Sequence, residues 1–132
     1  MLFTEHEVAY LATQRLGRLA TVQPNGTVQA SPVGFTVNDT LDTVDIGGRD
    51  MAATQKFRNL RVNQQVAFVV DDLASVDPWT VRGIEIRGTA EALVDPTDSA
   101  SRFDGPIIRI HPRRIISWGI NPDQAGMKGR DV

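Results

Sequence analysis

Residues 18–35 read RLATVQPNGTVQASPVGF, and this stretch indicates the fold class. Two runs rich in β-forming residues flank the dipeptide Asn25-Gly26, which is a strong short-range signal for a tight hairpin turn. A second polar break at residues 38–40 precedes the segment LDTVDIGG. We therefore predict a hairpin that extends into a three-strand meander ending at Gly48.

A helix is predicted on the N-terminal side of this hairpin. Thr4 and Glu7 have the T-x-x-E spacing of a capping box, in which two side chains satisfy backbone N–H groups at the start of a helix. Val8, Leu11 and Ala12 follow at positions i, i+3 and i+4. We expect a short amphipathic helix that lies on an apolar surface.

The segments that follow the meander alternate between helical and β-type patterns. Helical spacing of apolar residues predicts a helix over residues 50–63. The run QVAFVVDD predicts a largely buried strand at 65–72, and an acidic loop is expected at 73–78.

The last part of the chain predicts three more strands. A long strand is expected at 80–93, within which Gly83 and Gly88 each predict a bulge or bend. PIIRIHP at 106–112 and RRIISWGI at 113–120 then predict two further strands.

These elements indicate one domain over residues 1–132, with 121–132 as a flexible tail. Six or seven predicted strands against two helices, mostly joined by short turns, indicate a mainly β fold. We expect a closed or nearly closed antiparallel barrel.

Composition and charge exclude several classes of function. The 14 Lys and Arg residues against 16 Asp and Glu residues give a net charge of −2, which provides no general attraction for nucleic acid or an anionic membrane. The chain has no cysteine, so disulfides, thiolate metal sites and cysteine nucleophiles are excluded. Without a signal-peptide pattern or a long apolar run, we expect a cytoplasmic protein.

Familiar catalytic motifs are missing from the sequence. It contains no G-x-S-x-G, H-E-x-x-H, phosphate-binding loop or G-x-G-x-x-G pattern. His6 and His111 are far apart in the chain, and we interpret each as a solvated or capping residue. We therefore expect neither a metal site nor a catalytic side chain.

A local group of cations is the first candidate binding site. Four basic residues and one acidic residue give this segment a charge of +3: Arg49, Lys56, Arg58, Arg61 and Asp50. Gly47 and Gly48 precede the group, and glycines let the backbone approach a ligand whose phosphate the cations neutralise. A solvated basic helix face explains the same composition, and residue types alone favour that interpretation.

The segment QASPVGF is a second candidate, because Pro32 lacks a ladder donor and so predicts an edge strand. Backbone groups and Ser31 would then be free to meet a planar ligand, although a plain edge strand or bulge is the alternative. Trp79 and Trp118 could wall an aromatic pocket, but tryptophan more often fills a core or a dimer interface.

Four segments in order resemble the pyridoxamine 5′-phosphate oxidase-like split-barrel family, and within it the small flavin- or deazaflavin-dependent oxidoreductases. They are RLATVQPNGTVQASPVGF at 18–35, KFRNLRVNQQVAFVVDD at 56–72, RGIEIRGTAEAL at 82–93 and IRIHPRRIISWG at 108–119. Together they cover most of the chain. The closing P-R-R-I-x-S-W-G is similar to the deazaflavin-dependent subgroup.

The resemblance implies a six-stranded antiparallel split β-barrel with two or so short helices. It also implies a homodimer with two cofactor sites in the grooves between the subunits. Ser31, Pro32 and Val33 would lie along the tricyclic ring of the cofactor, with backbone groups hydrogen-bonding its edge.

The resemblance further implies where the tail of the cofactor is held. Arg49 and Lys56 would bind its phosphate, with Gly48 in the same cofactor-binding set. Asn59 would hold the helix in place, and Trp79 would reach the groove from the partner subunit.

The same resemblance implies an oxidoreductase. The segment GRDMAATQ at 48–55 matches the phosphate-binding pattern of FMN-dependent relatives only loosely, and the substrate-binding C-terminal segment of the oxidase is not evident. We therefore expect the deazaflavin coenzyme F420, whose reduced form would transfer a hydride to a small electron-poor acceptor such as an enone, a quinone or a tetrapyrrole.

Two other functions stay open at this point. One is an FMN-dependent flavin reductase or oxidase of the same fold. The other is a non-catalytic protein that binds F420 or another planar ligand such as haem. Neither the F420-dependent nor the FMN-dependent oxidoreductase needs a catalytic side chain, because the cofactor carries the hydride chemistry.

Overall fold

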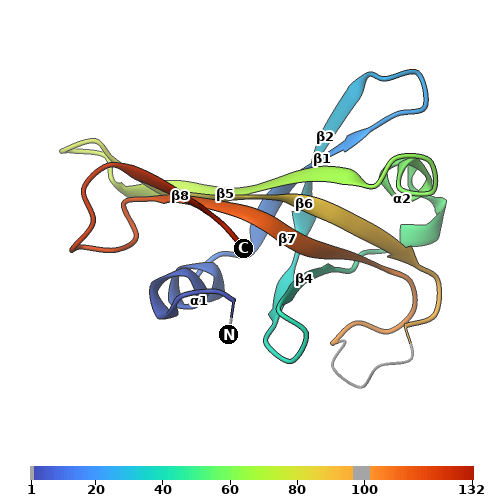
Figure 1. The fold of residues 1–132 in the computed structure, drawn as a ribbon, viewed down its shortest axis with the longest axis horizontal. Helices are drawn as coiled ribbons and strands as arrows, with labels where there is room; N and C mark the ends of the chain where they lie inside the picture. The colour runs from blue at the N-terminus through green and yellow to red at the C-terminus, as the bar shows by residue number, and fades with distance from the viewer. Residues whose placement is uncertain (1, 97–101) are drawn as a thin grey trace.

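The computed structural model of the chain describes residues 2–96 and 102–132. Within these residues, a first helix precedes four strands, and two short helices separate these from four further strands (Figure 1). They are α1 (Glu5–Ala12), β1 (Leu16–Val22), β2 (Val28–Gly34), β3 (Thr36–Asn38), β4 (Thr43–Ile46), the 3-10 helix η1 (Met51–Ala53), α2 (Gln55–Asn59), β5 (Gln65–Ser75), β6 (Thr80–Leu93), β7 (Ile107–Trp118) and β8 (Met127–Asp131). The predicted mainly β fold is confirmed, with eight strands in the described residues where six were expected.

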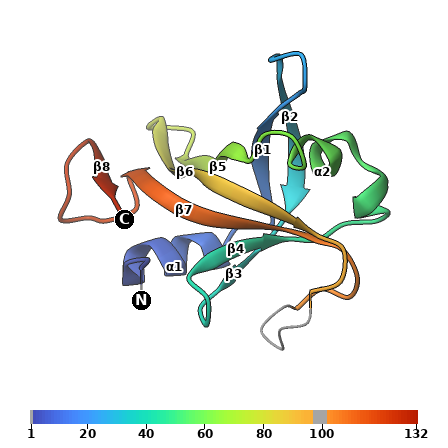
Figure 2. The same ribbon diagram turned by 45° about the vertical axis from the view of Figure 1, so that its right-hand side comes forward.

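The strands form one antiparallel sheet in the order β2-β1-β5-β6-β7-β4-β3, and β8 pairs with β7 beyond the end of β4. The predicted β1–β2 hairpin is confirmed, with Gly26 at a positive φ of 89° in its turn. The predicted three-strand meander is wrong, because β2 and β3 lie at opposite ends of the order. Only Phe35 separates these two edge strands in the chain, so the sheet curls into the half-barrel of Figures 1 and 2.

The inner face of the curled sheet holds the hydrophobic core. The Phe35 and Phe68 rings meet edge to face, with their centroids 5.2 Å apart, an arrangement that aromatic pairs favour. Leu11 of α1 joins this core. Fully buried isoleucines from the central strands complete it: Ile46, Ile84, Ile86, Ile108, Ile110 and Ile115.

β7 is one continuous strand where two had been predicted, at 106–112 and 113–120. Pro112 lacks a backbone N–H, and a register shift next to Gly88 on β6 accommodates it. β4 pairs with β7 before Pro112 and β8 pairs after it, so neither of these ladders needs the missing donor. An irregularity thus occurs at Gly88, as predicted, but the extra residue of the ladder is Arg113 on β7.

A bulge or a bend was predicted at Gly83, and the structure has no bulge there. Gly83 lies in regular register opposite Trp118. A Cβ atom at Gly83 would come within 2.6 Å of the Trp118 ring, so the glycine is explained by the close approach of the indole.

Two predicted boundaries around α2 and β5 also differ from the structure. The helix expected over 50–63 is divided into η1 and α2, because the backbone at Thr54 is extended and its hydroxyl accepts from the Phe57 N–H at 3.3 Å. The hydroxyl thereby caps a new helix. The acidic loop expected at 73–78 is shorter, because β5 continues to Ser75.

The flexible tail expected at 121–132 instead contains β8, which pairs with β7. The Arg130 guanidinium donates hydrogen bonds of 2.6 and 2.7 Å to the Glu7 carboxylate, and Glu7 is only 2% exposed. Glu7 also completes the predicted capping box with Thr4, which is confirmed. These charge-assisted bonds hold the last strand against α1.

The described residues include no helix that is long and apolar enough to cross a membrane.

A buried ion pair joins β4 to β7. The Asp45 carboxylate accepts hydrogen bonds from Nε and Nη2 of Arg109 at 2.9 and 3.0 Å, and the two side chains are 1% and 6% exposed. Asn38 Nδ2 and Thr43 Oγ1 donate to the same carboxylate at 3.0 and 3.1 Å. Groups from β3, β4 and β7 therefore converge on one buried charge.

Replacing the Asp45 carboxylate tests how much the ion pair contributes to the free energy of unfolding. Asp45→Ala is expected to lower the free energy of unfolding by about 3–5 kcal/mol, because it breaks a buried ion pair by removing one partner. Urea denaturation followed by circular dichroism measures the loss. Arg18→Ala breaks an exposed pair with Asp71 at 3.5 Å and serves as the control, with an expected change below about 1 kcal/mol. Equal losses in the two variants would contradict the assignment.

Candidate functional site

The short helix α2 is fixed against β1 and β2 by one buried amide. Asn59 Nδ2 donates to Thr21 Oγ1 at 2.9 Å and to Gln29 Oε1 at 3.0 Å. Gln55 Nε2 in turn donates to Asn59 Oδ1 at 2.7 Å. Asn59 is fully buried, so it positions the helix and presents no group at the surface.

Two of the four cations in the candidate phosphate site are engaged inside the helix region. The Arg58 guanidinium donates to the Ala53 carbonyl at 2.6 Å and to Gln55 Oε1 at 2.9 Å. The Arg61 guanidinium lies 5.6 Å from the centroid of the Phe57 ring, within the range of a cation–π contact.

The other two cations, Arg49 and Lys56, are the ones selected for the cofactor phosphate. Among the described residues, neither side chain has a hydrogen-bond or ion-pair partner. Lys56 precedes the anchoring Asn59 by three positions, and residues three apart share one side of a helix. Lys56 is therefore on the same side of α2 as Asn59, and it is half-buried. Gly48 and Arg49 are both exposed after the end of β4.

β2 supplies the second part of the candidate site. The edge position predicted from Pro32 is confirmed, since β2 ends the strand order. Ser31 Oγ is buried without a hydrogen-bond partner in the described structure. Val33 is buried on the same face, and Pro32 is exposed on the other. Ser31 follows Gln29 by two positions, so it shares the strand face that α2 packs on.

Trp79 lies far from these groups within one chain. It is 69% exposed in the turn between β5 and β6. That turn and α2 lie at opposite ends of the molecule in Figure 1. The structure thus brings together the β2 and α2 residues of the predicted site but not Trp79.

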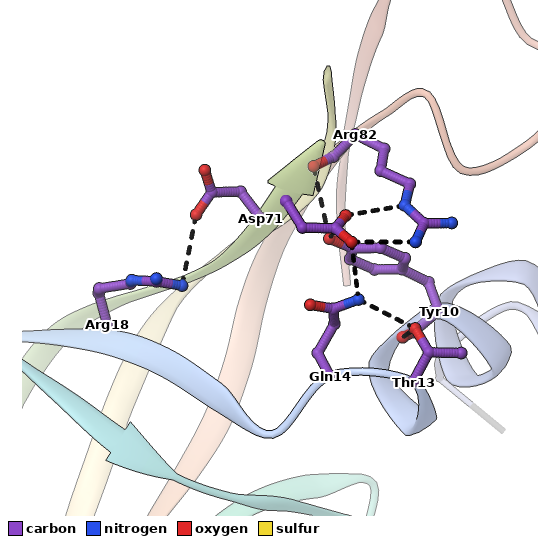
Figure 3. A network of polar contacts seen from close by, with 7 residues as sticks. Tyr10, Thr13, Gln14, Arg18, Asp71 and Arg82 are labelled. Atoms are coloured by element: carbon purple, nitrogen blue, oxygen red, sulfur yellow. Dashed lines mark hydrogen bonds and ion pairs between the residues drawn. The ribbon is translucent and has the colours of Figure 1, made fainter. Parts of the chain in front are cut away.

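A polar network around Asp72 escaped prediction (Figure 3). Arg82 donates to the Asp72 carboxylate through Nε at 2.7 Å and Nη2 at 3.0 Å. Tyr10 Oη and Gln14 Nε2 donate to the same carboxylate at 2.9 and 3.1 Å. The network ties α1 and the residues after it to β5 and β6. Asp72 and Arg82 are equally far from Asp77 in the sequence. A hairpin predicted with its turn at Asp77 would have placed these two residues opposite each other.

These contacts shift two pKa values in the network. The hydrogen bond from Arg82 is the main cause that lowers the pKa of Asp72 from 3.8 to about 2. Burial, followed by the hydrogen bond to Asp72, raises the pKa of the Tyr10 phenol above its usual value. Tyr10 therefore keeps its proton at neutral pH and is a poor proton donor for a reaction.

The histidines lie apart from the candidate site. His6 is exposed on α1, and His111 Nε2 lies 2.6 Å from Glu91 Oε2 on the sheet. Among the described residues, no group of three or more His, Cys, Asp or Glu side chains is placed to hold a metal ion.

The sequence of the chain matches a known protein family. The profile of the pyridoxamine 5′-phosphate oxidase family matches residues 3–125. The chain belongs to this family. The predicted resemblance is confirmed.

A reductase is among the relatives of this family member. A protein of Streptomyces rimosus subsp. rimosus, named 5a,11a-dehydrotetracycline/5a,11a-dehydrooxytetracycline reductase, is 46% identical over 136 residues, which cover 100% of this chain and 94% of the relative. The predicted assignment to the oxidoreductases is confirmed by this relative.

Two solved structures have a fold similar to that of this chain. A conserved hypothetical protein of Mycobacterium tuberculosis is 25% identical with a TM-score of 0.68, over 89% of this chain and 86% of that chain. A structure named F420 reductase is 25% identical with a TM-score of 0.57, over 76% of this chain and 87% of that chain.

The Asp72 network gives this family member a specific acid sensitivity. The pKa of Asp72 is about 2 in the folded chain and 3.8 in its ordinary state, so the unfolded chain binds the proton first as the pH falls. The contribution of the network to stability is complete above the ordinary pKa and is lost as the pH falls through the folded value.

Asp72→Asn is therefore expected to flatten the decline in unfolding free energy between about pH 5 and about pH 2.5, since the titrating group is gone. Urea denaturation at a series of pH values measures both profiles. Parallel profiles for the variant and the wild type would show that Asp72 carries no linkage to folding.

Proposed function

We propose that this oxidoreductase binds the deazaflavin coenzyme F420 along β2 and beside α2, and uses its reduced form to reduce a polycyclic, electron-poor acceptor. The observation that carries the proposal is the state of Arg49 and Lys56. Within the described chain, these two cations have no side-chain partner, while Arg58 and Arg61 beside them are engaged. A phosphate group supplies the missing partner.

The groups around these cations fit a phosphorylated planar cofactor. The partnerless Ser31 hydroxyl is a buried polar atom, and a native structure rarely leaves such an atom without a hydrogen bond. A ligand along β2 would satisfy it. Gly48 carries no side chain next to Arg49, so backbone N–H groups can approach a phosphate there.

The chemistry of such a site divides between cofactor and protein. When bound, reduced F420 supplies the hydride, and solvent supplies the proton that completes the reduction of one carbon–carbon double bond. The protein holds the phosphate with Arg49 and Lys56 and positions α2 through Asn59. Tyr10 donates a hydrogen bond to Asp72, and its raised pKa makes it a poor general acid.

The substrate class rests on the Streptomyces relative. That protein is named for dehydrotetracyclines, which are four-ring molecules with a conjugated double bond. Identity of 46% over the whole chain supports an acceptor of the same kind for this protein. The similar structure named F420 reductase supports the choice of F420 over FMN.

We further propose that the enzyme is a homodimer. On the outer face of the sheet, Ala20 of β1 lies opposite Ala67 of β5, and Val69 of β5 lies opposite Arg18 of β1. Such a surface suits contact with a second copy. Trp79 of the same chain lies far from the proposed cofactor groove. The partner subunit's Trp79 would then complete that groove.

Arg49→Ala and Lys56→Ala are each expected to weaken F420 binding about tenfold or more, because a charge-assisted hydrogen bond contributes roughly 1.5–3 kcal/mol. Fluorescence titration of the purified protein at fixed salt measures the affinity. Arg61→Ala removes the same charge from the same segment and serves as the matched control, with wild-type affinity expected.

Parallel titration with FMN separates the cofactor alternatives. Tighter binding of FMN than of F420 would move the protein to the flavin-dependent reductases or oxidases. Tight F420 binding without turnover of any polycyclic acceptor would instead favour a carrier protein. Unchanged F420 affinity in both single variants and in the double variant would reject the phosphate site.

Sedimentation equilibrium is expected to give about twice the chain mass of 14.5 kDa. Trp79→Ala should weaken F420 binding without lowering the melting temperature, because the exposed ring contributes nothing to the core of its own chain. Val76→Ala in the same turn, where Val76 is 70% exposed, is the matched control. A monomer that binds F420 normally would contradict the shared groove.

A further inference from the structure

A hollow with a volume of about 330 Å³ lies between α1 and β3. Its lining includes the buried Leu11 and the half-buried Val8, Phe35 and Val37. The exposed Asp39 and Arg102 also line it. Apolar walls with a few polar groups and a volume of roughly 300–1,000 Å³ are typical of small-molecule sites.

The hollow adjoins the strand of the proposed cofactor site. Phe35 lies two residues beyond Val33, which is a distance of about 7 Å along an extended chain. The chain then continues without interruption into β3, whose Val37 lines the hollow. A molecule in the hollow would therefore lie next to a ring held along β2.

The helix that walls the hollow is rigidly held on its other side. Tyr10 Oη donates to Asp72 at 2.9 Å. Glu7 accepts from Arg130 at 2.6 and 2.7 Å. Figure 2 shows α1 alongside β3 and β4. Because these bonds fix α1, Val8 and Leu11 are preorganised at the hollow, which lowers the entropic cost of binding.

We propose that this hollow binds the acceptor of the reaction. The acceptor is a fused four-ring molecule that carries one positive and one negative charge on its polar edge. The apolar body of such a molecule packs on Leu11, Phe35 and Val37. Its ammonium group meets Asp39, and its acidic enol meets Arg102. This inference rests on the proposed function for its substrate class and names the surface that selects that class.

A steric block on α1 tests the proposal. Ala12 and Ala9 are both exposed on this helix, but only Ala12 lines the hollow. Equilibrium dialysis of the cofactor-free protein with oxytetracycline, in the presence of EDTA, measures binding of a stable four-ring probe. Ala12→Trp is expected to weaken it at least tenfold, whereas Ala9→Trp keeps wild-type affinity. Both variants should bind F420 as the wild type does.

A second variant guards against misfolding of the first. Asp39→Asn changes one exposed charge and is expected to weaken the probe severalfold with an unchanged melting temperature. Wild-type probe affinity in both Ala12→Trp and Asp39→Asn would overturn the proposal, as would a wild-type protein that does not bind the probe. A loss of dimer mass confined to Ala12→Trp would also overturn it and assign the hollow to a second copy of the chain.

Failure of the proposed cofactor function can be distinguished from failure of the proposed acceptor site. Failure of the wild type to bind F420 rejects the cofactor assignment, while the dialysis experiment still reports on the hollow.

Discussion

The two edge strands of the sheet are consecutive in the chain, and the rest of the structure depends on this constraint. A single residue, Phe35, connects β2 at one end of the strand order to β3 at the other. A flat sheet cannot satisfy such a short connection, so the strands between them must curl. The Phe35 ring then turns inward onto Phe68. The same bend brings the strand with Ser31 and the hollow beside Val37 into one neighbourhood.

Acidic side chains inside this curled sheet are consistently matched with arginines. Asp45 binds Arg109 across β4 and β7, and Glu7 binds Arg130 between α1 and β8. Asp72 and Arg82 repeat the arrangement across β5 and β6, near the turn of that hairpin. An unpaired buried charge is costly, so each pair specifies which elements meet. Arg49 and Lys56, at and next to α2, have no such acidic partner among the described residues. We therefore expect a site for an external anion there.

Local signals in the sequence were sufficient for local structure. The capping box at Thr4 and the turn at Gly26 involve residues a few positions apart, and both were predicted correctly. The strand order was not predictable in this way, because it depends on contacts between distant segments. β8 was missed for the same reason: its stability comes from β7 and from the distant Glu7. For the candidate site, residue types and resemblance selected Arg49 and Lys56, but only the structure distinguishes the unengaged cations from their neighbours.

The place of β4 in the sheet also constrains when the chain can fold during its synthesis. β4 lies between β3 and β7, and β7 begins only at Ile107. Val44 and Ile46 are fully buried in the finished fold, yet they have no second partner strand until most of the chain has left the ribosome. Chains elongate at about 5–20 residues per second, so this apolar hairpin stays uncovered for several seconds.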